Sequence, residues 1–290
     1  MHRAKAFLIL LAAALPALGV DFSGESAMAF ARKAVSFGPR PPNSAAIRNM
    51  QTWLIGQLRA MKYQVSEDDF KGETPLGPMP MKNIIARRPG TSGRAVVITG
   101  HYDTKLFPGR RFVGANDGGS SAALLLEMAR VVSTRGYNDD IWFVWFDGEE
   151  AIGEWSSVDG VHGSRHLAAK WSMDGTLARI KALINVDMIG DKDLGILQEM
   201  NSSEPLRRLV WQAAKETGYG KYFLDYGGPI EDDHMPFLKR GVNALDLIDF
   251  DYGPNNKYWH TDQDTIDKIS AHSLEVVGNV LLEVLRRISA

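Results

Sequence analysis

Two adjacent carboxylates, Glu149 and Glu150, are the residues of this chain whose type and spacing point most directly to chemistry. They follow the run Ile141–Phe146, whose six residues are all apolar and either β-branched or aromatic. Such a run is typical of a strand that is buried on both faces of a parallel sheet. The carboxyl ends of these strands face the ligand crevice of an open α/β sheet. Two carboxylates at that edge can have different roles, because one can bind a metal ion while the other accepts and donates a proton.

Further acidic and histidine side chains follow other predicted strands. They are His101 and Asp103, Asp117, Asp187, the segment Glu231-Asp232-Asp233-His234, and His260. Side chains at the carboxyl ends of neighbouring parallel strands converge on one edge of the sheet. Carboxylates held close together repel each other unless a cation lies among them or they share protons. Oxygen and imidazole donors without a thiolate suit a catalytic Zn²⁺ ion, which keeps one coordination position open for water or substrate.

Each of these residues has a simpler interpretation when it is taken alone. An aspartate after a strand commonly caps a helix or forms a turn, and Glu149-Glu150 could belong to a solvated loop. Asp232-Asp233 could precede a short helix, where acidic side chains stabilise the helix dipole. A single histidine is more often a surface or core residue than a ligand. The recurrence of acid and histidine side chains after successive strands is what favours a metal site.

The elements that must position these residues alternate between strands and helices. Buried strands are predicted at Lys82–Arg87, Arg94–Gly100, Ile141–Phe146, Lys181–Asp187 and Asn243–Ile248. Helices are predicted to begin near Asn43-Ser44 and to span Ala122–Val132, Val161–Trp171, Pro205–Thr217 and Ser270–Ile288. This alternation predicts a single α/β domain with a mixed, mostly parallel central sheet and helices on both faces. The Gly- and Pro-rich segment Lys71–Met81 is expected to be a surface loop.

The composition limits the classes of function that the chain can have. It has 290 residues, a formal net charge of -2 and no cysteine. The lack of cysteine excludes disulfide bonds and thiol chemistry. The near-neutral charge gives no sign of a nucleic-acid-binding surface, so we expect no nucleic-acid partner.

The N-terminal residues have the features of an export signal. Met1–Lys5 is basic, an apolar stretch runs from Ala6 to Leu15, and Ala17 and Gly19 suit a cleavage site after Gly19. We therefore expect a signal peptide at residues 1–19 and a catalytic domain at residues 20–290, in a protein that is periplasmic or secreted. The apolar stretch is short for a membrane span, so an uncleaved N-terminal anchor is the alternative. No other segment approaches that length, and we expect no further contact with a membrane.

The order of the motifs resembles that of the zinc-dependent aminopeptidase clan. The matching residues are His101 in His-x-Asp, Asp117 in Gly-Ala-x-Asp, the pair Glu149-Glu150, Asp187 in Val-Asp, and the late His260. Within the clan, the chain from about Pro39 onward most resembles the glutaminyl-peptide cyclotransferases. Four segments carry this closer resemblance: Phe146–Ala151 with Trp155, Gly163–Ala168, Glu231–Leu238, and Trp259–Thr261. Other aminopeptidases of the clan have a shorter link after the Glu pair and usually lack the Asp-Asp-His-x-Pro-Phe element.

The resemblance implies an aminopeptidase-like fold and a Zn²⁺ ion held by Asp117, Glu150 and His260. It implies that Glu149 is the proton shuttle, with Asp187 and Asp232 beside it in an acidic hydrogen-bond network. Trp155 and Trp259 would line the substrate pocket. The implied substrates are peptides or proteins with an N-terminal glutamine, which cyclises to pyroglutamate with release of ammonia. We expect one zinc ion and a monomeric enzyme.

Two alternative functions remain open. One alternative is a secreted metalloaminopeptidase with one or two zinc ions, because His101 and Asp187 occupy the positions at which related aminopeptidases bind a second zinc ion. In that enzyme Glu149 would activate a zinc-bound water. A non-catalytic binding protein of this fold is the other alternative, although an intact ligand set argues against it.

The chain departs from the resemblance at Asp246, where animal cyclotransferases tend to carry a histidine. Any hydrogen bond that the resemblance implies for that histidine is therefore in doubt here.

Overall fold

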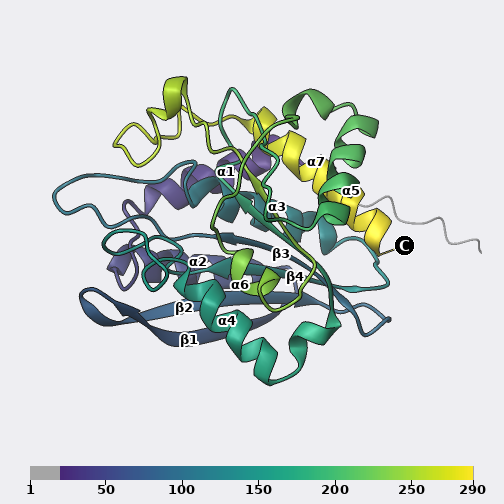
Figure 1. Cartoon of the computed structure of the whole chain (residues 1–290), viewed down its shortest axis with the longest axis horizontal. Helices are drawn as coiled ribbons and strands as arrows, with labels where there is room; N and C mark the ends of the chain where they lie inside the picture. Colours follow the sequence, from purple (N-terminus) through teal and green to yellow (C-terminus); the bar gives the residue numbers. More distant parts are fainter. Residues whose placement is uncertain (1–19, 290) are drawn as a thin grey trace, which may run out of the picture.

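A mixed six-stranded sheet forms the centre of the molecule in the computed structural model, which describes residues 20–289 (Figure 1). The predicted signal peptide lies outside the described residues. The strands are β1 (Gln64–Thr74), β2 (Gly77–Arg88), β3 (Ala95–His101), β4 (Asp140–Phe146), β5 (Ile180–Asp187) and β6 (Ala244–Ile248). Their order is β1-β2-β4-β3-β5-β6. Strands β4, β3, β5 and β6 are parallel, and the β1–β2 and β2–β4 pairs are antiparallel. The predicted fold class is therefore confirmed.

Strand β4 presents apolar side chains to both faces of the sheet, and each face is covered by a hydrophobic cluster. Its side chains alternate, so that Ile141, Phe143 and Trp145 join one hydrophobic cluster. Trp142, Val144 and Phe146 join a second cluster on the opposite face. The prediction of a strand buried on both faces is confirmed, since all six of these residues are buried.

The helices form one layer on each face of the sheet. The first layer holds α1 (Gly24–Ser36), α2 (Ala45–Ala60), α3 (Gly119–Val132), α5 (Glu204–Glu216) and α7 (Ala271–Ile288). The second holds α4 (His162–Met173) and the single turn α6 (Met235–Leu238). Figure 1 shows α1, α3 and α7 together above the strands and α4 and α6 in front of them. Short 3₁₀ turns occur at Thr176–Arg179, Gly220–Tyr222 and Pro254–Asn256.

The segment Lys71–Met81 is not the surface loop that its glycines and prolines predict. It forms the end of β1, a tight turn and the start of β2. Strand β2 pairs with β4 only from Ile84 to Arg88. The part of β2 that carries Pro78 and Pro80 therefore has a neighbour on one side only, which is where a strand tolerates proline.

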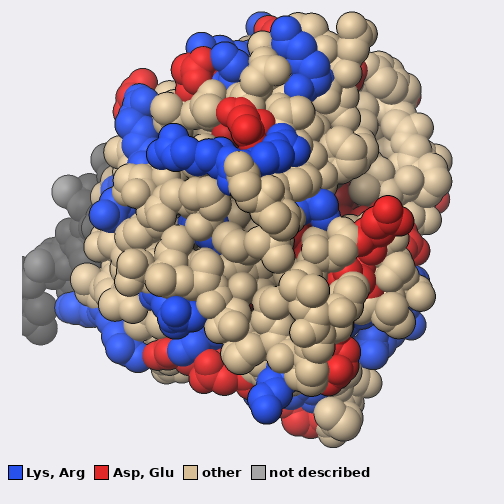
Figure 2. Space-filling view, turned by 90° about the vertical axis from the view of Figure 1, so that its left-hand side faces the viewer, with Lys and Arg blue, Asp and Glu red and all other residues tan. Residues whose placement is uncertain are grey.

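The surface of residues 20–289 shows no single dominant charge on the face seen in Figure 2, where Lys and Arg are interspersed with Asp and Glu. Residues other than Lys, Arg, Asp and Glu cover most of the middle of that face. Among residues 20–289, no helix combines the length and the apolar character needed to cross a membrane.

Candidate active site

The loops that follow β3, β4 and β5 meet around a cavity of about 530 Å³. Eight of the residues predicted for the site line it: Asp117, Glu149, Glu150, Trp155, Asp187, Asp232, Trp259 and His260. His101, the ninth, is only 1 % exposed and lies behind Asp117 and Asp187. Residues that are up to 143 positions apart in sequence thus share one cavity, because the parallel strands end at the same edge of the sheet.

One group of possible metal ligands consists of Asp117, Glu150 and His260. The Nε2 atom of His260 lies 3.2 Å from Glu150 Oε1 and 3.3 Å from Asp117 Oδ2. Asp117 Oδ2 is buried and accepts no hydrogen bond from the described residues. Two carboxylates and an imidazole with an orphaned buried oxygen among them fit a divalent cation such as Zn²⁺, which would neutralise the paired acids.

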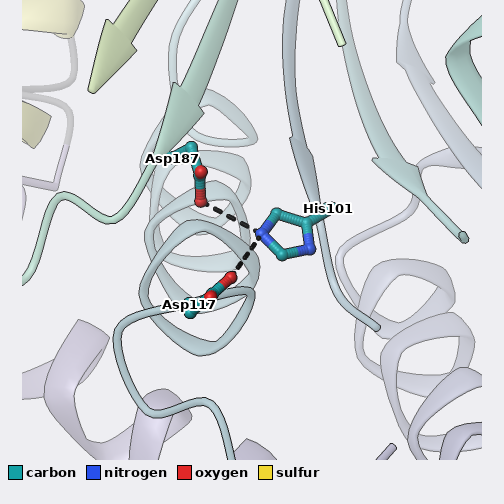
Figure 3. A group of neighbouring side chains, drawn as sticks. All are labelled: His101, Asp117 and Asp187. Atoms are coloured by element: carbon teal, nitrogen blue, oxygen red, sulfur yellow. Dashed lines mark hydrogen bonds and ion pairs between the residues drawn. The ribbon is translucent and has the colours of Figure 1, made fainter. Parts of the chain in front are cut away.

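A second group shares Asp117 and adds His101 and Asp187. Figure 3 shows the three side chains pointing toward one another from the end of β3, the loop before α3 and the end of β5. His101 Nε2 lies 3.0 Å from Asp187 Oδ1 and 3.3 Å from Asp117 Oδ1. This group is fully buried, and its residue types could also hold a cation.

Two acidic side chains that sequence reasoning gave no role hold the backbone of the site. Asp103 accepts hydrogen bonds from the N–H groups of Glu149 (3.2 Å) and Glu150 (3.3 Å). Asp264 accepts hydrogen bonds from the N–H groups of Asn116 (2.8 Å) and Asp117 (3.1 Å). Asp103 belongs to the His-x-Asp motif, which could have indicated it, whereas no sequence pattern pointed to Asp264.

The turn between Asp117 and α3 requires a glycine. Gly118 has a φ of +77°, which L side chains rarely adopt, and a Cβ there would lie 2.3 Å from the carbonyl oxygen of Asp103. The same Cβ would lie 3.0 Å from His101 Cε1. Gly118 therefore allows Asp117 and His101 to approach each other.

The carboxylates of the site have pKa values far from their usual range. Burial raises the pKa of Glu149 well above its usual value, and the charges of Glu150, Asp232 and Asp233 add to the effect against the opposing His101. Burial likewise raises the pKa of Asp187 to about 7, although the neighbouring His101 opposes the shift. A bound cation lowers such pKa values again. Glu149 is therefore placed in an environment that favours the protonated form of its carboxyl group more than water does.

Aromatic side chains form the wall around His260. Its imidazole stacks on Trp259 with ring centroids 4.1 Å apart. Phe107 and Phe112 contact the same imidazole edge to face, at 5.7 and 5.8 Å. His260 has a φ of +54°, a conformation that a non-glycine residue adopts only where its surroundings hold it. Phe250, which sequence reasoning missed, packs on Trp259 at 5.0 Å and also lines the cavity.

Asp246 and Asp232 extend the acidic network behind the cavity. Asp246 is fully buried on β6 and accepts a hydrogen bond from Asn185 at 3.1 Å. Burial raises the pKa of Asp246 well above its usual value, and the charges of Asp232 and Asp187 add to this shift. The aspartate at this position is thus hydrogen-bonded to Asn185, which in turn accepts a hydrogen bond from Thr99 at 2.8 Å.

Residues 83–285 match the model of peptidase family M28. The chain is 31 % identical to a glutaminyl-peptide cyclotransferase of Bos taurus over 278 residues, which cover 84 % of this chain and 76 % of that protein. The structure of an Acidobacteriales bacterium glutaminyl cyclase matches with a TM-score of 0.89 and 42 % identity, covering 96 % of this chain and 99 % of that one. A Zn-dependent exopeptidase from Parabacteroides distasonis matches with a TM-score of 0.82 and 28 % identity over 92 % and 98 % of the two chains.

Proposed function

Because the chain belongs to peptidase family M28 and, within it, to the glutaminyl-peptide cyclotransferases, we propose that it cyclises the N-terminal glutamine of peptides and proteins in a zinc-dependent reaction. The α-amine of glutamine attacks its own γ-carbonyl carbon, a new C–N bond forms, and the amide C–N bond breaks to release ammonia. Since both reacting groups belong to one residue, the enzyme mainly has to orient them and move one proton.

The observation that carries this proposal is that the Glu pair presents two carboxylates to one cavity with different neighbours. Glu150 faces His260 and belongs to the possible ligand group with Asp117. Glu149 belongs to neither ligand group and keeps its carboxylate for proton transfer. It takes a proton from the α-amine and gives it to the departing nitrogen, so that ammonia leaves as a neutral molecule.

The proposed Zn²⁺ ligands are Asp117 and Glu150, which are buried, and His260, which is half-buried; their donor types fit the ion. When bound, zinc supplies Lewis-acid polarisation of the γ-carbonyl. Asp187 and Asp232 line the same cavity as Glu149, and the charge of Asp232 raises the pKa of Glu149. Trp155 and Trp259 form apolar walls that hold the methylene groups of glutamine and limit the access of water.

A metalloaminopeptidase is the second candidate function, and one observation favours it. His101, Asp117 and Asp187 form a second possible ligand group that shares Asp117 with the first. Two ions bridged in this way would allow Glu149 to activate a water for peptide hydrolysis. The cyclase remains the preferred function because the cyclotransferase and the cyclase named above are 31 % and 42 % identical to this chain, whereas the exopeptidase named above is 28 % identical.

We also propose that residues 1–19 direct export and that the catalytic domain acts as a periplasmic or secreted monomer. The basic and apolar residues at the N-terminus support export. Fractionation of cells that express the full chain tests this proposal. Recovery of a protein that begins at Val20 from the periplasm or medium supports it, and full-length protein in the membrane or cytoplasm contradicts it.

One experiment tests the proposed activity against its alternatives. The zinc-loaded protein is incubated separately with a Gln-initiated and a Leu-initiated peptide, and the products are identified by mass. Loss of ammonia from the first peptide without chain shortening supports the cyclase. Release of free leucine from the second supports the aminopeptidase, and no change in either peptide supports a binding protein.

A further inference from the structure

The loop of residues 151–160 carries Trp155 and is tied at both ends to the backbone of the Glu pair. It leaves the site directly after Glu150 and returns at Val161, whose N–H donates to the carbonyl of Glu149 at 2.7 Å. The next N–H, of His162, donates to the carbonyl of Gly148 at 2.7 Å. These two hydrogen bonds hold the end of the loop beside the Glu pair, but they do not hold its interior.

Asp159 is the buried acidic side chain that bonds to the interior of this loop, where Lys105 also donates to the carbonyls of Ala151 and Gly153 and Arg165 to that of Val158. It is 2 % exposed, and its carboxylate accepts hydrogen bonds from the N–H groups of Ile152 (3.0 Å) and Gly153 (2.7 Å). His162 Nε2, at the start of α4, lies 3.1 Å from Asp159 Oδ1. Arg165 lies 3.3 Å from His162 Nδ1, and the N–H of Gly160 lies 3.3 Å from His162 Nε2, so the imidazole contacts the loop at both Asp159 and Gly160. Asp159 thus joins the first residues of the loop, Ile152 and Gly153, to the start of α4.

The ring of Trp155 rests on the part of the loop that Asp159 holds. Gly160 has a φ of +116°, and a Cβ there would lie 2.9 Å from Trp155 Cε3. The Trp155 side chain is large and the residue is 42 % exposed, so solvent covers much of its other side. Trp155 also lines a neighbouring cavity of about 220 Å³, which makes its ring a shared wall between the two cavities.

We propose that Asp159 is a positioning residue, which holds Trp155 in place as a wall of the substrate cavity through Ile152, Gly153 and His162. The substrate named in this proposal rests on the proposed cyclase function. Glu149 and Glu150 have a separate anchor in Asp103. Loss of Asp159 therefore displaces the substrate wall without displacing the carboxylates of the Glu pair.

The test combines kinetics with a signal from Trp155 itself. In the zinc-loaded enzyme, Asp159→Ala raises KM for a Gln-initiated peptide about tenfold and leaves kcat within about twofold. Asp225→Ala, which removes an exposed aspartate from a loop far from residues 151–160 in sequence, is the matched control and changes neither. In the background of Trp155→Ala, Asp159→Ala has little further effect on KM, because the wall that it positions is already gone. An equal effect of Asp159→Ala on KM in both backgrounds overturns the proposal.

Acrylamide quenching of tryptophan fluorescence needs no turnover and separates this proposal from the proposed function. The contribution of Trp155 is assigned by comparison with Trp155→Phe. Asp159→Ala makes that contribution more accessible to acrylamide, and unchanged quenching overturns the proposal even if the enzyme is an active cyclase.

Gly160→Ala is the second variant, for use if Asp159→Ala does not fold. It pushes directly on the Trp155 ring and is expected to change KM and quenching in the same directions. Absence of cyclisation by the wild type contradicts the proposed function, and the quenching result then decides the proposal on its own.

Discussion

The carboxylate of Asp264 accepts a hydrogen bond at 3.1 Å from the backbone N–H of Asp117, which lies 147 residues earlier in the chain. Its other oxygen accepts hydrogen bonds from the N–H of Asn116 and the hydroxyl of Tyr252, both at 2.8 Å. His260 lies only four residues before Asp264. One C-terminal loop therefore supplies a proposed zinc ligand and also holds the backbone of a second one.

The first prediction concerns this contact. Asp264→Ala leaves the buried N–H groups of Asn116 and Asp117 without acceptors, which costs about 1–3 kcal/mol of stability. We expect zinc affinity to fall by about 10- to 100-fold, because Asp117 is no longer held in place. Competition with a chelator measures the affinity, and urea unfolding measures the stability. Asp262→Ala, which removes an exposed partner of Arg110, is the control and retains both. Unchanged zinc affinity in Asp264→Ala would show that the contact does not support the site.

The second prediction separates the roles of the Glu pair. Glu149→Gln is expected to lower kcat by about 10²- to 10⁴-fold while zinc content stays unchanged, because only the proton-transfer group is lost. Glu150→Gln is expected to lose both zinc and activity. Elemental analysis and steady-state rates on a Gln-initiated peptide measure the two properties. Loss of zinc from Glu149→Gln, or retention of zinc by Glu150→Gln, contradicts the assignment.

The third prediction decides between one and two zinc ions. His101 lies between Asp117 and Asp187 and contacts both. We expect His101→Gln to bind as much zinc as the wild type and to lose activity through altered placement of Asp187. A fall from two zinc ions per chain in the wild type to one in His101→Gln contradicts this expectation and favours the aminopeptidase.

The fourth prediction concerns stability against acid. Burial raises the pKa of Glu199, but hydrogen bonds from His234, Ser202 and the amides of Ile230 and Asn201 outweigh it and lower the pKa from 4.5 to about 2. A carboxylate whose pKa is lowered by folding contributes stability above pH 4.5, and this contribution is lost as the pH falls to about 2. We expect Glu199→Gln to be about 1–3 kcal/mol less stable than the wild type at pH 7. The difference should shrink between pH 4.5 and pH 2.

Urea unfolding of the two proteins at pH 7 and pH 3 measures this effect. Both proteins are stripped of metal first, because acid also releases zinc from its ligands. Glu204→Gln, at an exposed position on α5, is the control and shows no such difference. A stability difference that does not change with pH would mean that the charge of Glu199 does not contribute.

The sequence predicted the parts of the fold and site that depend on local patterns. The apolar runs of β3, β4, β5 and β6 locate the parallel strands, and their carboxyl ends locate the acids and histidines of the cavity. Strand β1 was missed because it lies at the edge of the sheet, where polar residues such as Glu67 and Lys71 alternate with few buried ones. An edge strand needs no continuous apolar run.

Contacts between distant segments could not be predicted in this way. Asp264 acts on Asp117 across 147 residues, and Asp103 acts on the Glu pair across 46 and 47 residues. Asp264 looks like an ordinary loop residue in the sequence, and the His-x-Asp motif that contains Asp103 does not show which backbone groups it binds. Their roles depend on which backbone N–H groups the folded chain brings within hydrogen-bond distance.

The central claim is that the α-amine of glutamine, and not water, attacks its γ-carbonyl carbon. Tracing the oxygen of water into the products tests this claim most directly. The zinc-loaded enzyme is incubated with a Gln-initiated peptide in ¹⁸O-labelled water, and the product is analysed by mass spectrometry. Attack by the α-amine uses no water, so the account predicts a product of unchanged length that has lost ammonia and contains no ¹⁸O. A deamidated peptide that carries ¹⁸O in its side-chain carboxyl, or a shortened peptide together with free glutamine whose α-carboxyl carries ¹⁸O, would show attack by water and contradict the account.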